Sequence, residues 1–190
     1  MTMISQRPAE VTDRFTPGHW EGDTIAGTMN RTAIGTMVER TCRFLLLGHS
    51  DGQRSSATVT DGVINAFAAV PGHLRRSLTW DQGREMAEHQ RITAATGMRV
   101  YFCEAHSPWQ RGSNENMNGL LRDYFPKGAD LSRYSAEDLK HVQDELNNRP
   151  RKCLNWRTPA EVFHALRPSI RNRLLRRSLE SALSFPSCRH

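Results

Sequence analysis

The chain has 190 residues, of which 37% are hydrophobic and 24% are charged. This length and composition suit a single globular domain with one hydrophobic core. No run of about 20 apolar residues occurs, so the sequence predicts no membrane span. Residues 1–10 lack the apolar stretch of a signal peptide, and the four cysteines are widely spaced and unpatterned, which favours a reducing cytoplasm over secretion.

The formal net charge is +6, and it is unevenly distributed along the chain. Residues 167–190 contain six arginines and one acid and carry +5, which leaves +1 for residues 1–166. A basic surplus is typical of proteins that bind nucleic acid or another polyanion. Here the surplus belongs to the terminal segment, and the main part of the chain is nearly neutral.

The amino-terminal half predicts strands first and then alternating helices and strands. Residues 1–14 are interpreted as a leader or linker. Apolar alternation and short apolar runs predict strands over 19–25, 33–39 and 44–48, and their short links suggest an antiparallel meander. A helix follows with its apolar stripe within 59–67, then a strand over 77–80, a helix over 86–96 and a strand over 99–103. This order predicts an α/β fold with a mixed five-stranded sheet flanked by helices.

The remainder of the chain predicts helices. A helix begins near Ser113 and has one apolar and one polar face. Capping boxes at Ser135 and Thr158 open two more helices, of which the first ends before Pro150 and the second runs through Leu166.

Three acids stand out by their positions in these elements. Asp23 lies within the first strand, Asp81 follows the fourth strand, and Glu115 begins the helix after the sheet. If the first and fourth strands are neighbours, both aspartates point to one spot, and a crossing helix adds the glutamate. Three carboxylates at one point repel each other unless a hard cation such as Mg²⁺ binds them, and no basic partner is evident in the sequence.

The same residues also have simpler interpretations. The chain contains 20 acids, a strand-end aspartate often forms a turn, and a first-turn glutamate often interacts with the helix dipole. Glu21 shares a strand face with Asp23, where it either assists the site or forms a salt bridge.

Several long stretches carry recognisable motifs: residues 17–23, 79–83 and 107–116, extended by 118–122, 124–128, 148–152 and 157–161. Together they resemble the insertion sequence 30 family of bacterial DDE transposases, in order, over about residues 15–166. The resemblance implies a ribonuclease H-like catalytic domain of the retroviral integrase type. It also implies that Asp23, Asp81 and Glu115 are the catalytic acids and hold two Mg²⁺ or Mn²⁺ ions.

The activity implied by this resemblance is metal-dependent DNA strand cleavage and strand transfer in transposition. The implied partners are transposon ends, target DNA and further copies of the chain assembled on DNA, in the bacterial cytoplasm at the nucleoid. No P-loop or dinucleotide fingerprint occurs, so no nucleotide cofactor is expected. Cys103 and His106 have zinc-like spacing but lack a second pair, so zinc is not expected.

Four residues near Glu115 are candidates for DNA contacts. Arg122 lies on the same helix face and either holds a phosphate or belongs to a solvated face. Asn118 either bonds DNA or caps a loop. In the loop before this helix, Arg111 is a candidate contact, and Trp109 either stacks on DNA or serves as a partly buried anchor.

Two departures from the family pattern leave the function open. Relatives carry helix-turn-helix segments before the catalytic domain, whereas this chain begins in what resembles the linker. Residues 167–190 resemble nothing in the family and form either a basic amphipathic helix or a chance terminus. The alternatives to an active transposase are therefore a truncated, inactive remnant that binds DNA or interferes with an active element, and a general nuclease of the same fold.

Overall fold

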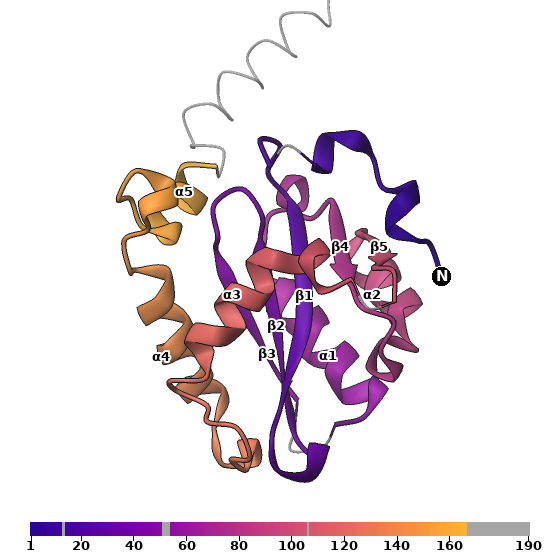
Figure 1. Ribbon diagram of the computed structural model, residues 1–190, viewed down its shortest axis with the longest axis vertical. Coiled ribbons are helices and arrows are strands. Elements are labelled where there is room, and N and C mark those ends of the chain that lie inside the picture. The colour runs from indigo at the N-terminus through magenta and orange to yellow at the C-terminus, as the bar shows by residue number, and fades with distance from the viewer. Residues whose placement is uncertain (13, 51–53, 106, 167–190) are drawn as a thin grey trace, which may run out of the picture.

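The computed structural model describes residues 1–12, 14–50, 54–105 and 107–166 (Figure 1). The predicted basic tail at 167–190 and His106 lie outside these residues. Within the described part of the chain, no helix is long and apolar enough to cross a membrane.

One mixed sheet forms the centre of the molecule, with the strand order β3-β2-β1-β4-β5. The first three strands pair antiparallel, and β4 and β5 continue the sheet parallel to β1. The predicted meander is confirmed, and β1 and β4 are neighbours, which is the condition for Asp23 and Asp81 to point to one spot. The strands are β1 (His19–Ala26), β2 (Ala33–Glu39), β3 (Leu45–His49), β4 (Ser77–Trp80) and β5 (Arg99–Phe102).

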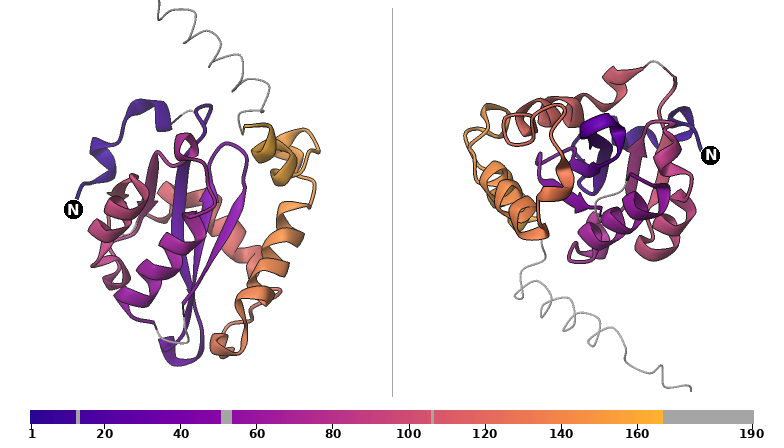
Figure 2. Two further views of the ribbon diagram at one scale, coloured as in Figure 1. Left: turned by 180° about the vertical axis from the view of Figure 1, so that it is seen from behind. Right: turned by 90° about the horizontal axis from the view of Figure 1, so that it is seen from below.

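Helices cover both faces of this sheet (Figures 1 and 2). One core cluster includes side chains of α1 and α2, and a second core cluster includes side chains of α3 and α4. The capping boxes at Ser135 and Thr158 are present, as predicted. The helices are α1 (Ser56–Phe67), α2 (His89–Thr96), α3 (Gly112–Leu121), α4 (Ala136–Asn147) and α5 (Pro159–Ala165).

The predicted helix over 86–96 is wrong at its start. A 3-10 turn occupies Arg84–Met86, and α2 begins only at His89. The backbone N–H of Glu88, the residue before α2, donates to the hydroxyl of Ser56 in α1 at 3.1 Å. Backbone N–H groups at a helix start have no acceptor within the helix, so this contact with α1 satisfies Glu88 where α2 begins.

Side chains of β1 alternate between the two cores. Trp20 belongs to the cluster with α1 and α2, and Ile25 to the cluster with α3 and α4. Glu21 and Asp23 share the face of Ile25, because alternate residues of a strand point the same way. Gly22 points to the opposite face, where a Cβ atom would lie 2.0 Å from the Trp80 ring, so only glycine permits this packing.

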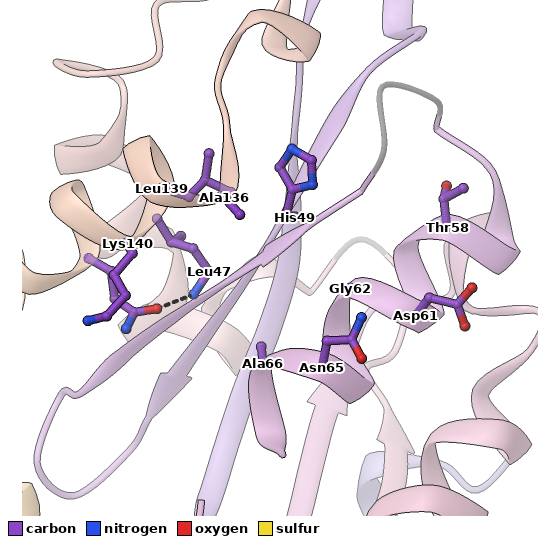
Figure 3. A pocket seen from close by; sticks show the side chains of 11 residues that line it. Leu47, His49, Thr58, Asp61, Gly62, Asn65, Ala66, Ala136, Leu139 and Lys140 are labelled. Carbon is purple, nitrogen blue, oxygen red and sulfur yellow. Dashed lines mark hydrogen bonds between the residues drawn. The ribbon is translucent and has the colours of Figure 1, made fainter. Parts of the chain in front are cut away.

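The outer edge of β3 is covered by side chains of α4. Asn147 is buried and exchanges two hydrogen bonds with the backbone of Leu45, at 2.8 and 2.9 Å. Gln143 accepts a bond from the Leu47 N–H at 2.9 Å, the dashed line in Figure 3. A pocket of about 380 Å³ opens between α1 and α4 beside this edge and includes none of the three predicted acids (Figure 3).

The first twelve residues, interpreted as a leader or linker, pack against this domain. The Phe102 N–H of β5 donates to the Thr2 carbonyl at 2.9 Å, and Met3 forms a parallel bridge with Phe102. Val11 is buried, and its carbonyl accepts a bond from Arg40 at 2.6 Å. The segment thus extends the sheet at β5 and contributes to the core.

Candidate active site

Asp23 and Asp81 occupy equivalent positions on neighbouring parallel strands. The register pairs Glu21 of β1 with Thr79 of β4, and each aspartate lies two residues further along. A two-residue step restores the same face of a strand, so the pairing directs both carboxylates to the same side of the sheet. The Gly83 N–H donates to Asp81 at 3.0 Å, which holds that side chain in a turn after β4.

A guanidinium joins these two carboxylates. Arg111 Nη1 lies 3.1 Å from Asp23 Oδ2, and Nη2 lies 3.3 Å from Asp81 Oδ2. Arg111 is buried and also donates to the Gly22 carbonyl at 3.0 Å. The expectation that the acids lack a basic partner is therefore wrong. Arg111 immediately precedes α3 and is 30 positions from Asp81, so no local sequence pattern indicates the pairing.

The charges in this cluster depend on one another. Burial raises the pKa of Asp23 above its ordinary value, although the positive charge of Arg111 opposes the rise. Burial alone would lower the pKa of Arg111, but Asp23 and Asp81 raise it above its ordinary value. The guanidinium therefore stays charged and reduces the repulsion between the two aspartates.

Glu115 lies in the first turn of α3, near this cluster but not in it. Asn118, one helical turn after Glu115, donates to Asp23 Oδ2 at 3.2 Å. The side of α3 that carries both residues therefore faces Asp23. The Glu115 side chain is exposed and has no hydrogen bond or ion pair with any described residue. Among the described residues, no three His, Cys, Asp or Glu side chains are close enough to hold one metal ion. The structure thus brings two of the three predicted acids together.

The donor set nevertheless fits a hard divalent cation. Two carboxylates converge on a position that holds a positive charge, and Mg²⁺ prefers carboxylate oxygens while retaining open positions for substrate. Glu115 adds an unpaired carboxylate on the adjacent helix. A pocket of about 350 Å³ beside Asp81 and Arg111 gives access to the position that Arg111 occupies.

Glu21 fastens α3 to the sheet next to this cluster. Its buried carboxylate accepts the backbone N–H groups of Ser113 at 2.7 Å and Asn114 at 3.1 Å. It also forms an ion pair with Arg40 at 3.0 Å, which confirms the predicted salt bridge. The buried amide of Asn114 donates to the carbonyls of Glu21 and Thr36 at 2.9 and 2.8 Å. The anchoring of α3 by Glu21 is not predicted from the sequence. The only available indication is that Glu21 lies on the same strand face as Asp23.

The four predicted DNA contacts have different surroundings. Arg111 and Asn118 both contact Asp23. Arg122 is half-buried and donates to the carbonyls of Ala26 and Phe125, both at 3.3 Å. Trp109 is 72% exposed, so its interpretation as a partly buried anchor is wrong.

Comparisons with known proteins agree with this architecture. The integrase core domain family matches residues 15–108. The transposase for insertion sequence element IS1086 of Cupriavidus metallidurans is 53% identical over 163 residues, covering 86% of this chain and 48% of that protein. Transposase InsI for insertion sequence element IS30A of Escherichia coli is 45% identical over 162 residues, covering 85% of this chain and 42% of that protein. The chain thus spans a little under half the length of these relatives.

A solved structure supports the fold. A chain of the simian T-cell lymphotropic virus intasome, determined in complex with PP2A regulatory subunit B56 gamma, superposes with a TM-score of 0.60 at 21% identity. The match covers 80% of this chain and 56% of that chain. At this identity the likeness concerns the fold alone.

The mixed five-stranded sheet has one aspartate in β1 and one directly after the neighbouring β4, and α3 lies over the same face. This arrangement defines a ribonuclease H-like core of the integrase type. Within that class, the long and closely similar match to the two transposases identifies the family. The chain belongs to the insertion sequence 30 family of transposases.

Proposed function

We propose that this domain performs metal-dependent DNA strand cleavage and strand transfer, with Asp23, Asp81 and Glu115 as catalytic, metal-binding acids. The observation that carries the proposal is the convergence of Asp23 and Asp81 on one cationic position, at 3.1 and 3.3 Å. Kinship with transposases supports phosphodiesters as the substrate. The expected ions are two Mg²⁺ or Mn²⁺.

The side chains have separate tasks in this proposal. Two bound divalent ions supply activation of the attacking hydroxyl and stabilisation of the leaving oxygen. Asp23 and Asp81 hold the ions from the rigid sheet, and Glu115 contributes the third carboxylate from α3. Arg111 holds the two aspartates together in this structure. Where divalent ions took its place, its guanidinium would be available for a DNA phosphate, which is the contact expected of Arg111 from the sequence.

The proposed partners are transposon-end DNA, target DNA and further copies of this chain assembled on DNA. Trp109 is exposed in the segment just before α3, where an indole ring can stack on a base. Asn118 and Arg122 are the other proposed contacts, both on the side of α3 that faces β1. No observation on the described residues favours the alternative of an inactive remnant.

The direct test is the substitution Glu115→Gln. The side chain is exposed and unpaired, so this change removes a charge without disturbing the fold. With Mn²⁺ present, nicking and joining of an end-containing duplex should fall at least about 100-fold, while retention of the duplex changes little. Glu137→Gln, at an exposed position in the first turn of α4, is the matched control and should cleave like the parent.

Two results would contradict the proposal. Parent-like cleavage by the Glu115→Gln variant would remove Glu115 from the reaction. Absence of any Mn²⁺-dependent cleavage by the parent chain, on end-containing and scrambled duplexes alike, would contradict the activity itself.

A further inference from the structure

A pocket lined by three arginines lies on the other flank of α3 from the aspartates. It has a volume of about 360 Å³ and is lined by α3 residues Gly112, Ser113, Asn116 and Met117. The three arginines come from separate segments: Arg14 precedes β1, Arg43 lies between β2 and β3, and Arg151 follows α4. We call these three residues and the space between them the arginine pocket.

The positive charge of the arginine pocket is not neutralised by the described residues. None of Arg14, Arg43 and Arg151 forms an ion pair with a described carboxylate. The nearby carboxylate of Glu21 is already matched by Arg40 at 3.0 Å. Three like charges around one pocket repel each other, and an anion bound between them relieves that repulsion.

The side chains of Arg43 and Arg151 are held in place by contacts that leave donors free. Arg43 donates to the hydroxyl of Ser113, which fixes its guanidinium against α3. Arg151 donates one Nη2 bond to the Leu146 carbonyl at 3.4 Å, and its buried Nε has no partner among the described residues. Burial and the charge of Arg149 lower the pKa of Arg151. An anion bound beside Arg151 would raise that pKa again. Guanidinium groups with unused donors match the oxygens of a phosphate.

The position of the pocket relates it to the proposed site. Ser113 and Asn116 of α3 line the pocket, whereas Asn118 on another side of the helix contacts Asp23. A helix with its side chains is about 10–12 Å across, and one DNA strand advances about 3.4 Å per nucleotide. A strand that passes over α3 therefore spans the distance between the two flanks in about three or four nucleotides.

We propose that the arginine pocket binds a backbone phosphate of the DNA strand that crosses α3, a few nucleotides from the phosphate at Asp23 and Asp81. The inference rests on the proposed function for its ligand, because it takes DNA as the polyanion. It adds a second phosphate site that fixes the direction of the strand across the helix. This site works without divalent ions, since arginine alone supplies the charge.

The test measures DNA binding in EDTA, where metal-dependent chemistry is absent. The double variant Arg43→Gln/Arg151→Gln keeps hydrogen-bond donors but removes two charges. Its Kd for a dye-labelled duplex at ~0.15 M salt should rise at least about tenfold for any sequence, and the salt slope should fall by about two units. Arg99→Gln on β5, an exposed arginine outside the pocket, is the control and should change Kd less than about threefold.

A measurement on the parent chain avoids any dependence on how the variants fold. Phenylglyoxal should modify Arg43 and Arg151 in the free protein, and bound duplex should protect both, as read by peptide mass spectrometry. Arg99 should be modified to the same extent with and without DNA. Lack of protection at both pocket arginines would overturn the proposal, as would a double variant that binds DNA as the Arg99→Gln control does.

Two further comparisons distinguish the DNA phosphate site from an acidic protein site and from the proposed catalytic function. Polyglutamate that competes as well as DNA at equal charge would assign the pocket to an acidic protein partner and overturn a DNA site. If Glu115→Gln cleaves like the parent, the catalytic assignment of Glu115 is refuted. If adding Arg43→Gln and Arg151→Gln to that variant still weakens DNA binding, the proposed phosphate site in the arginine pocket is supported independently.

Discussion

The carboxylate of Glu21 on β1 accepts the backbone N–H of Ser113 at the start of α3, at 2.7 Å across 92 positions of sequence. The Asn114 N–H and the Ser113 hydroxyl also donate to this carboxylate, at 3.1 and 3.4 Å, and Arg40 forms an ion pair with it. A strand residue two positions before Asp23 thus sets where the helix that carries Glu115 begins. The position of Glu115 relative to the two aspartates therefore depends on the bonds between Glu21 and the start of α3.

Glu21→Gln should destabilise the fold by about 3–5 kcal/mol, because it leaves the buried charge of Arg40 without a carboxylate partner. The amide oxygen still accepts the N–H bonds of α3, so the loss reports the ion pair. Urea unfolding measures it. Glu10→Gln, at a half-exposed glutamate 3.7 Å from Arg76, should cost less than about 1 kcal/mol.

The double variant Glu21→Leu/Arg40→Met separates the helix anchor from the ion pair. It removes both charges but also the acceptor of the Ser113 and Asn114 N–H groups. It should therefore remain less stable than the parent by about 2 kcal/mol or more. Full recovery of stability would show that Glu21 does not anchor α3.

Asn147→Ala should cost about 2–3 kcal/mol in unfolding free energy. Its side chain satisfies both the N–H and the C=O of Leu45 on the edge strand β3, and truncation leaves those backbone groups unpaired. The neighbouring Asn148 is exposed and bonds only within its own helix, to the Asp144 carbonyl at 2.9 Å. Asn148→Ala should stay within about 0.5 kcal/mol, and equal losses at both positions would contradict the role of Asn147.

Stability should fall as the pH drops from about 6.5 towards 4, and His19 should account for a defined part of the loss. Burial lowers the pKa of His19 from 6.5 to about 4, with Glu10 opposing and Arg76, Arg40 and Arg7 adding to the shift. The unfolded chain therefore binds a proton in this range that the folded chain does not. The limiting slope is about 1.4 kcal/mol per pH unit.

The pH measurement compares the parent with His19→Gln in urea at several pH values. Above pH ~6.5 the difference between the two should be constant, and it should shift in favour of the variant as the pH falls. Parallel curves throughout would show that His19 titrates normally in the folded chain.

Arg111→Gln should change the response of the protein to divalent ions. Without metal, the variant should melt below the parent, because Asp23 and Asp81 lose the charge between them. Mn²⁺ should then raise its melting temperature more than that of the parent, because no guanidinium competes for the carboxylates. Differential scanning fluorimetry with a Mn²⁺ titration measures both effects.

Two controls make the metal response specific. Arg122→Gln removes a charge that does not touch the aspartates and should respond to Mn²⁺ like the parent. Asp23→Asn/Asp81→Asn should lose the response. If Mn²⁺ raises the melting temperature of Arg111→Gln and of the parent equally, Arg111 does not compete with metal for the two aspartates.

The sequence alone determined most of the elements and the pairing of the first three strands. The alternation over 19–25 and 33–39, the apolar run near Leu45 and the short links between them are local, so they predict three strands of an antiparallel meander. Capping boxes at Ser135 and Thr158 are equally local, because a side chain bonds a backbone group three residues away. The order of elements places Asp23 and Asp81 on one side of the sheet only if the first and fourth strands are neighbours, and the structure shows that they are.

Only the tertiary structure decided which side chains meet at the site. Arg111 between the aspartates, Glu21 at the start of α3 and the arginine pocket all join segments far apart in sequence. Likewise, Ser56 of α1 accepts the Glu88 N–H just before α2, which begins later than the helix predicted over 86–96. Periodicity predicts which face of an element is buried. It does not predict hydrogen-bond partners, because several donors in the sequence could bond each buried acceptor. The packing of α3 and α1 on opposite faces of the sheet selects among them, because it sets which groups lie within hydrogen-bond distance.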